Sequence, residues 1–345
     1  MGARAALVAL VAALVAALPA AAAAPAGGAR LYGLGHAGDR GLQIPARGFT
    51  GGPVTTTNTG ETLNVFVADS YLATDPEMGQ RWADFLGGLL HGDELSRVTV
   101  YFAPLDRVRT DCGGGALACY DGDSETIFTV GTDLVEVSAA SILMHEYGHH
   151  VANSRRNDPW AAIDYGTKRW ASYANVCKRA EDGELSPGDE GDHYEVNPGE
   201  GFAEVYRVLS ERRAGLEESA WDIVDQALYP DDEELRLVEQ DVLEPWPGNT
   251  ATSIPGRFVR GNGNGRLFRT QAPYDGTLRV TLRSAANTNF ELRLRDTTTN
   301  EVLVVSPKIG RVKALRWSVC GTHAFTVGVR RASGYGAFTL TISKP

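Results

Sequence analysis

Five consecutive residues, His145-Glu146-Tyr147-Gly148-His149, combine metal-binding and proton-accepting side chains at helical spacing. On a helix, residues i and i+4 lie on one face, so both imidazoles would reach a single zinc ion about 2.0–2.1 Å away. Glu146 would lean over the adjacent position and take a proton from a metal-bound water. The pattern therefore predicts a zinc site with a general base beside it, rather than a structural pair of core histidines.

A third zinc ligand is expected downstream, because catalytic zinc takes three protein ligands and leaves one position for water. Glu200 and Glu204 lie at i and i+4 of a helix expected over residues 200–213. One could bind the metal while the other accepts an N–H from a ligating histidine. The alternative for both is an ordinary acidic helix face, but the apolar residues beside them favour partial burial.

The two motifs together resemble the gluzincin group of zinc metallopeptidases. The segment E-x-F-A-E, with a tyrosine upstream, is similar to the catalytic domain of the anthrax toxin lethal factor group. This resemblance covers about residues 111–213, and it implies that Glu200 is the third ligand and that Glu204 supports a ligand histidine. Gly199 stands where a thermolysin-type enzyme has Asn, and Asn153 stands where the metzincin pattern requires Gly.

Other polar residues are candidates for supporting roles. Tyr194 or His193, in the loop before Glu200, could donate a hydrogen bond to a developing oxyanion. His150 points about 100° away from His149 on the helix, which favours a structural role. Four aspartates could bind Ca²⁺, although no loop matches an EF-hand and solvated acids are the simpler interpretation: Asp121, Asp123, Asp189 and Asp192.

The elements expected around the motif are strands over residues 63–68, 98–102 and 126–130, and helices over 75–90, 138–153, 163–180, 200–213 and 217–243. Strand 126–130 is expected at the sheet edge, above the cleft. We predict an α+β zincin-like catalytic domain over residues 61–244, a linker over 245–256, and a small β-sandwich of about eight strands over 257–345. The segments "DGTLRVTL", "FELRLRD" and "GYGAFTLTIS" resemble bacterial pre-peptidase C-terminal domains, which implies a binding, targeting or secretion module.

The first residues indicate export. Residues 1–26 read as a signal peptide, with Arg4 before a short apolar run, and residues 27–60 as a propeptide or flexible lead-in. A secreted protein can form disulfides, so Cys112 and Cys119, which flank a Gly-rich segment, are expected to be bridged. Cys177 and Cys320 could pair with each other, or one could stay reduced.

The 345 residues carry a net charge of −10, which argues against nucleic acid or an anionic membrane as a partner. We therefore expect a secreted, extracellular zinc endopeptidase, monomeric, acting on protein or peptide substrates with one catalytic Zn²⁺. The alternatives are a secreted binding or adhesion protein that keeps the zincin body as a scaffold and binds through its β-sandwich, and a hydrolase of another amide or ester.

Overall fold

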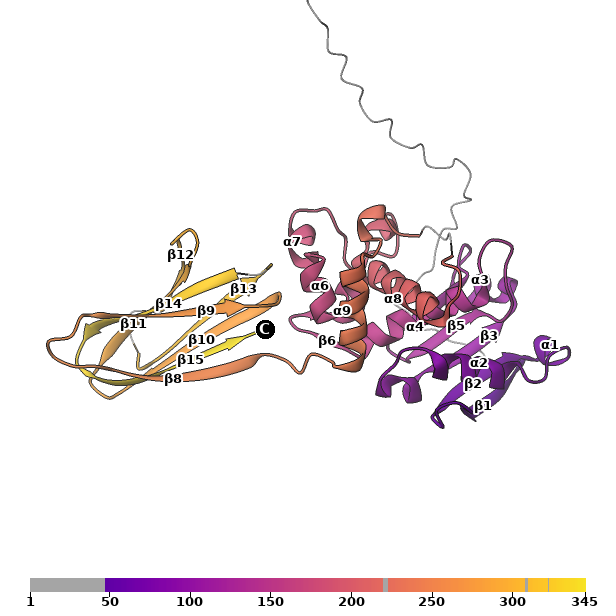
Figure 1. The fold of residues 1–345 in the computed structure, drawn as a ribbon, viewed down its shortest axis with the longest axis horizontal. Coiled ribbons are helices and arrows are strands. Elements are labelled where there is room, and N and C mark those ends of the chain that lie inside the picture. The colour runs from indigo at the N-terminus through magenta and orange to yellow at the C-terminus, as the bar shows by residue number, and fades with distance from the viewer. Residues whose placement is uncertain (1–46, 220–222, 308–309, 322) are drawn as a thin grey trace, which may run out of the picture. The chain divides into compact units, whose positions relative to one another are not determined.

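The computed structural model describes residues 47–219, 223–307, 310–321 and 323–345. These residues form a mixed α/β fold with several sheets and a β-rich C-terminal region (Figure 1). The expected signal peptide and most of the expected lead-in lie outside the described residues.

A five-stranded sheet organises the first part of the chain. Its strand order is β1-β2-β3-β5-β4, in which β2, β3 and β5 run parallel and the two outer strands run antiparallel to their neighbours. The strands are β1 (Phe49–Thr55), β2 (Thr62–Ala68), β3 (Thr99–Ala103), β4 (Ala118–Asp121) and β5 (Thr126–Val130). The three strands expected from alternation are thus present within one residue of their predicted bounds.

Two features of this sheet differ from expectation. Strand β1 lies inside the segment expected to be a loose lead-in, where it pairs with β2 over its whole length. The expectation that residues 126–130 form the edge strand is wrong, because β5 lies between β3 and β4. The edge strand on that side is β4, which follows the Gly-rich segment and pairs with β5 alone.

Two long helices carry the motifs. Helix α4 (Ala139–Asn153) begins at Ser138, whose hydroxyl accepts a hydrogen bond from the Ser141 backbone N–H at 3.0 Å, as the sequence predicted. Helix α8 (Pro198–Ala214) begins at Asn197, has Pro at its first position and ends at Gly215 with φ of +65°. Helix α4 packs on β4 and β5 and also on α8, so it is buried along nearly its full length.

The helix expected over residues 163–180 is three short helices, namely α5 (Ala162–Tyr165), α6 (Lys168–Tyr173) and α7 (Val176–Glu181). The first break is at Gly166, with φ of +74°, and the second at Asn175, with φ of +53°. A β-carbon on Gly166 would lie 2.1 Å from the Trp170 ring, so both the backbone angle and the packing require glycine there.

The remaining helices of this part are short or peripheral: α1 (Asp69–Leu72), α2 (Met78–Gly88), η1 (Asp93–Arg97), α3 (Leu105–Cys112), η2 (Tyr194–Val196), η3 (Gln226–Leu228) and α9 (Asp232–Leu243). A small ribbon pairs β6 (Arg156–Asn157) with β7 (Trp160–Ala161). Within the expected helical region 217–243, the described residues form only η3 and α9.

The C-terminal region has eight antiparallel strands in two four-stranded sheets, as the alternating pattern predicted. One sheet has the order β13-β10-β15-β8 and the other β12-β11-β14-β9. Apolar side chains from both sheets form a separate core. The strands are β8 (Thr250–Phe258), β9 (Gly265–Ala272), β10 (Gly276–Ser284), β11 (Asn289–Asp296), β12 (Val302–Val305), β13 (Val312–Val319), β14 (His323–Ser333) and β15 (Gly336–Lys344). Strand β8 begins inside the segment expected to be a linker.

All four cysteines are paired. Cys112 at the end of α3 bonds to Cys119 in β4, as predicted, and Cys177 in α7 bonds to Cys320, just after β13. Two disulfides fit an oxidising compartment outside the cytosol. Among the helices that the structure describes, none is both long and apolar enough to cross a membrane.

Candidate metal centre

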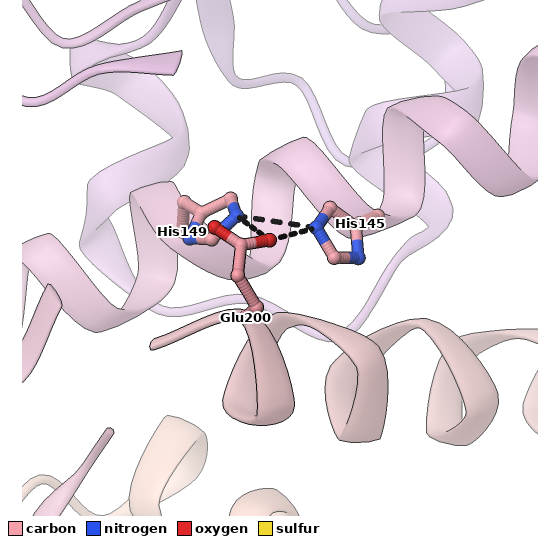
Figure 2. Close-up of side chains that lie close together, drawn as sticks. All are labelled: His145, His149 and Glu200. Atoms are coloured by element: carbon pink, nitrogen blue, oxygen red, sulfur yellow. Dashed lines mark hydrogen bonds and ion pairs between the residues drawn. The ribbon is translucent and has the colours of Figure 1, made fainter. Parts of the chain in front are cut away.

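Three side chains from α4 and α8 converge on one point in the interior (Figure 2). Nε2 of His145 lies 3.0 Å from Oε2 of Glu200 and 3.2 Å from Nε2 of His149. Nε2 of His149 lies 3.3 Å from the same oxygen of Glu200. Each of the three residues is at most 1% exposed. The geometry therefore places two imidazoles and one carboxylate in mutual contact, away from solvent.

Small residues let the two helices approach closely enough for this contact. A β-carbon on Gly148 would lie 2.9 Å from Cα of Ala203 and 3.2 Å from Cβ of Tyr206. Gly148 thus sits directly against the α8 backbone, between the two histidines in sequence. Sequence reasoning did not assign a role to Gly148, although a glycine inside a helix is itself a sign of close packing.

The donor set fits a zinc ion. Two imidazole nitrogens and one carboxylate oxygen are a known catalytic zinc set, and bonds of about 2.0–2.1 Å in a tetrahedron put the ligand atoms ~3.3 Å apart. The observed separations are 3.0–3.3 Å. Within the described ranges, the other cluster of this kind is Cys177, Glu181 and Cys320, where the disulfide occupies both sulfurs.

The charges at this point favour a cation. Burial alone would lower the pKa of His145, but hydrogen bonds and charge from Glu200 and Glu204 raise that pKa to about 9. Burial would raise the pKa of Glu200, yet the two histidines hold it well below its usual range. The site therefore stabilises positive charge between these groups, and a metal ion would displace the histidine proton on binding.

A second layer of charge lies behind His145. Oε2 of Glu204 is 3.5 Å from Nδ1 of His145, on the opposite side of the ring from Glu200. Both oxygens of Glu204 also accept hydrogen bonds from the Arg207 guanidinium, which bonds to Glu211 at 2.6 Å as well. Ser141 of α4 donates to Glu211 at 2.6 Å. Sequence reasoning missed Arg207 and Glu211, which the spacing i+3 and i+7 from Glu204 could have indicated.

The candidate general base and the two candidate oxyanion donors differ in burial and in their contacts with the three converging residues. Glu146 is 1% exposed, and its charge contributes to the raised pKa of His145. Tyr194 donates its hydroxyl to Oε2 of Glu200 at 2.6 Å, and burial raises its pKa well above the ordinary value, so the phenol stays protonated. His193 is exposed, with Nδ1 2.9 Å from Asp189. The structure thus brings Tyr194, but not His193, to the cluster.

The remaining candidates lie elsewhere. His150 is buried between the Tyr120 hydroxyl at 3.0 Å and the Glu94 carbonyl at 2.9 Å, and burial lowers its pKa, which fits a structural role. Of the acids considered for Ca²⁺, none belongs to a metal-binding cluster among the residues that the structure describes: Asp121, Asp123, Asp189 and Asp192.

Comparison with known proteins adds little. No family model matches the sequence, and no curated protein matches it. Among solved structures, the chain is similar to the pre-peptidase C-terminal domain of a collagenase from Bacillus anthracis, with 11% identity over 26% of this chain and 87% of that one and a TM-score of 0.24. It is also similar to the Yersinia pseudotuberculosis-derived mitogen, with 15% identity over 28% and 87% of the two chains and a TM-score of 0.23. These likenesses are distant and cover little more than a quarter of this chain.

Proposed function

We propose that this protein is a secreted zinc-dependent endopeptidase with a zincin-like catalytic domain. The observation that carries the proposal is the buried contact of His145, His149 and Glu200 with a carboxylate, Glu146, next to the first histidine on the same helix. Two neutral nitrogens and one anionic oxygen are suited to Zn²⁺, and these three residues would hold it. The resemblance of both motifs to the gluzincin group supports the same assignment.

When bound, zinc would supply a water of lowered pKa and polarise the scissile carbonyl. Glu146 would accept the proton of the attacking water and deliver it to the leaving amine nitrogen. Its burial strengthens the electrostatic interactions around it, because little water screens them.

Glu204 would hold the His145 ring in place from the Nδ1 side, as a carboxylate behind a metal-binding histidine commonly does. Arg207 would keep Glu204 ionised and oriented, since burial alone would raise the pKa of Glu204, whereas Arg207 and His145 together lower it. These two residues are positioning residues and would not touch the substrate.

We assign the oxyanion donor to Tyr194 rather than His193, because the Tyr194 hydroxyl already lies beside the ligand carboxylate and remains protonated. During the reaction the hydroxyl would exchange Glu200 for the developing oxyanion. A preorganised donor of this kind typically contributes about 10²–10³ in rate.

The decisive test is Glu146→Gln in the full-length protein. The variant should bind one zinc ion per chain, since no ligand is removed, yet lose nearly all cleavage of casein. The exposed Glu136→Gln is the matched control and should keep both properties. Casein cleavage by the E146Q variant would reject Glu146 as the base.

A second outcome separates the endopeptidase from the other classes. Wild-type protein that holds zinc but cleaves neither casein nor a mixed peptide library would favour a binding protein that keeps the site as a scaffold. Chelator-sensitive hydrolysis of non-peptide esters or amides alone would favour the third class.

A further inference from the structure

Charge is distributed very unevenly along this sequence. Residues 257–345 contain 15 Lys and Arg but only four Asp and Glu, a net charge of +11. The whole chain carries −10, so residues 1–256 carry −21. The negative charge of the whole chain therefore comes from residues 1–256, whereas the C-terminal β region is strongly positive.

Four of these arginines lie on the outward face of the sheet β12-β11-β14-β9, whose strands Figure 1 labels: Arg269, Arg293, Arg295 and Arg330. Side chains alternate between the inward and outward faces along each strand, so Glu291, Arg293 and Arg295 of β11 and Leu267 and Arg269 of β9 face outward. Strand pairing then aligns Arg295 with Thr326 and Arg269 in one row across the sheet, and Arg330 with Glu291 in another. Arg293 and Arg295, two residues apart on β11, are ~7 Å apart along the strand, and Arg295 and Arg269 are ~10 Å apart across it.

A shallow groove of about 260 Å³ lies on this face. Its floor is Gly328, which the register places between Arg293 on one side and Leu267 on the other. Gly328 places no side chain between them, and a β-carbon there would lie 3.5 Å from Cδ2 of Leu267, which is 73% exposed along one wall. Two more arginines that line the groove face outward, Arg295 and Arg330, whereas Arg266, which also borders it, alternates to the inner side of β9.

Most of this charge is not neutralised by the protein. Arg293 pairs with Glu291 on the same strand. For Arg295 and Arg330, the described part of the chain provides no carboxylate within ion-pair distance, and Arg295 donates to the carbonyl of Asn300. Arg266 is on the inner side of β9, where its guanidinium lies 5.4 Å from the centroid of the Phe258 ring. Guanidinium groups without acidic partners beside an apolar wall are suited to a ligand that presents both a carboxylate or sulfate and an apolar ring face.

We propose that this arginine groove binds an acidic polysaccharide, a chain of sugar rings that bear carboxylate or sulfate groups. A ring would lie over Gly328 and against Leu267, while its anionic substituents would pair with Arg295 and Arg330. The neighbouring rows of arginines would continue the contact along the polymer. The groove would thereby attach the protein to an anionic extracellular matrix or cell surface.

Two other polyanions fit the groove less well. Single-stranded nucleic acid is usually held by aromatic side chains that stack on its bases, and none of the groove-lining residues is aromatic. An anionic bilayer is usually held by a broad apolar face beside the basic one, whereas the apolar side chains among the described groove-lining residues are the exposed Leu267 and the buried Val329. The predicted export of the chain also places it where acidic polysaccharides are the common polyanions.

The test uses the full-length protein and a matched pair of polymers, dextran sulfate and uncharged dextran of equal length. Binding is measured by fluorescence anisotropy of the labelled polymers at low and physiological ionic strength. The variant Arg295→Gln/Arg330→Gln removes two groove arginines. The control Arg279→Gln/Arg316→Gln removes two exposed arginines that face each other across β10 and β13 on the other sheet, with the same change in net charge.

We expect dextran sulfate but not dextran to bind, with an affinity that falls as salt rises. The groove variant should bind about tenfold more weakly and show a shallower salt dependence, while the control changes little. Both variants should retain the wild-type thermal unfolding midpoint and casein cleavage, so this test is independent of the proposed enzymatic function.

Three outcomes would overturn the proposal. Equal weakening by both variants would mean that net charge, rather than the groove, attracts the polymer. Tighter binding of DNA or of anionic vesicles than of dextran sulfate, lost in the groove variant, would assign the groove to that other polyanion. Concentration-dependent self-association lost only in the groove variant, without dextran sulfate binding, would mean that the groove binds the acidic part of a second copy.

Discussion

Replacing Glu204 by Gln should weaken the proposed zinc binding, although Glu204 is not one of the three proposed ligands. Its carboxylate lies 3.5 Å from Nδ1 of His145, the ring nitrogen that faces away from Glu200. Glutamine keeps the size and an acceptor oxygen but removes the negative charge that favours a proton on Nδ1. Loss of such a partner behind a metal-binding histidine typically costs 10–100-fold in metal affinity, which corresponds to ~1.4–2.8 kcal/mol.

The structure offers a matched control for this experiment in Glu211→Gln. Glu211 also pairs with Arg207, at 2.6 Å, and is equally buried, but it accepts its other bonds from Ser141 and from the Ser219 backbone N–H, and it does not contact His145. Both substitutions remove one of two carboxylates around the same buried guanidinium, so both should lower the free energy of unfolding of the metal-free protein. Zinc affinity is measured by competition with a chromophoric chelator, and stability by urea unfolding.

If the contact between Glu204 and His145 supports zinc binding, E204Q should lower zinc affinity more than about threefold, and E211Q should not. Equal losses in E204Q and E211Q would refute the reasoning, because they would trace the effect to the rigidity of the whole Arg207 network. Complete loss of zinc in E204Q with retention in Glu200→Gln would refute it differently, by making Glu204 the ligand.

Three further predictions concern stability. Zinc added to chelator-treated protein should raise the thermal unfolding midpoint in a concentration-dependent way, because the ion binds the folded state; an unchanged midpoint would contradict the metal site. Cys112→Ala/Cys119→Ala should lower the free energy of unfolding by ~2–3 kcal/mol, measured in urea, since the bridge closes a short loop of the unfolded chain. Burial, with the charge of Asp231, raises the pKa of Glu234 to about 7. The folded state therefore binds that proton more tightly than the unfolded chain, so the free energy of unfolding should fall by at most ~3 kcal/mol as pH rises from 4.5 to 7, and Glu234→Gln should remove this fall.

The elements that were predicted accurately are those determined by neighbouring residues in the sequence. Helix α4 was predicted from its first to its last residue because Ser138 is a strong N-cap and the apolar residues that follow keep helical spacing. Strand β5 was predicted with its observed bounds because five β-forming residues stand between turn residues. The contact between His145 and His149 needs only the helix itself, since residues i and i+4 are neighbours on its face.

The errors arose where distant parts of the chain decide the outcome. Residues 49–55 contain Gly51, Gly52 and Pro53 and look unlike a strand, yet β1 forms because β2 offers it a complete pairing partner. Nothing local shows that β4 lies outside β5, because strand order is a tertiary property. In residues 163–180 the apolar spacing outweighed Gly166, whose positive φ ends the first short helix.

Arg207 favours Glu200 over Glu204 as the proposed third ligand, a choice that helix geometry alone leaves open. Both carboxylates reach His145, Glu200 at Nε2 and Glu204 at Nδ1, and both lie on one face of α8. Arg207, one turn beyond Glu204, binds both oxygens of Glu204 through its guanidinium. A carboxylate held in this bidentate way has most of its acceptor capacity occupied, so it is a poor ligand for a cation. Glu200 instead contacts Nε2 of both histidines and accepts from the Tyr194 hydroxyl, and the histidines hold its pKa well below the usual range, so it keeps the negative charge that a zinc ion would require.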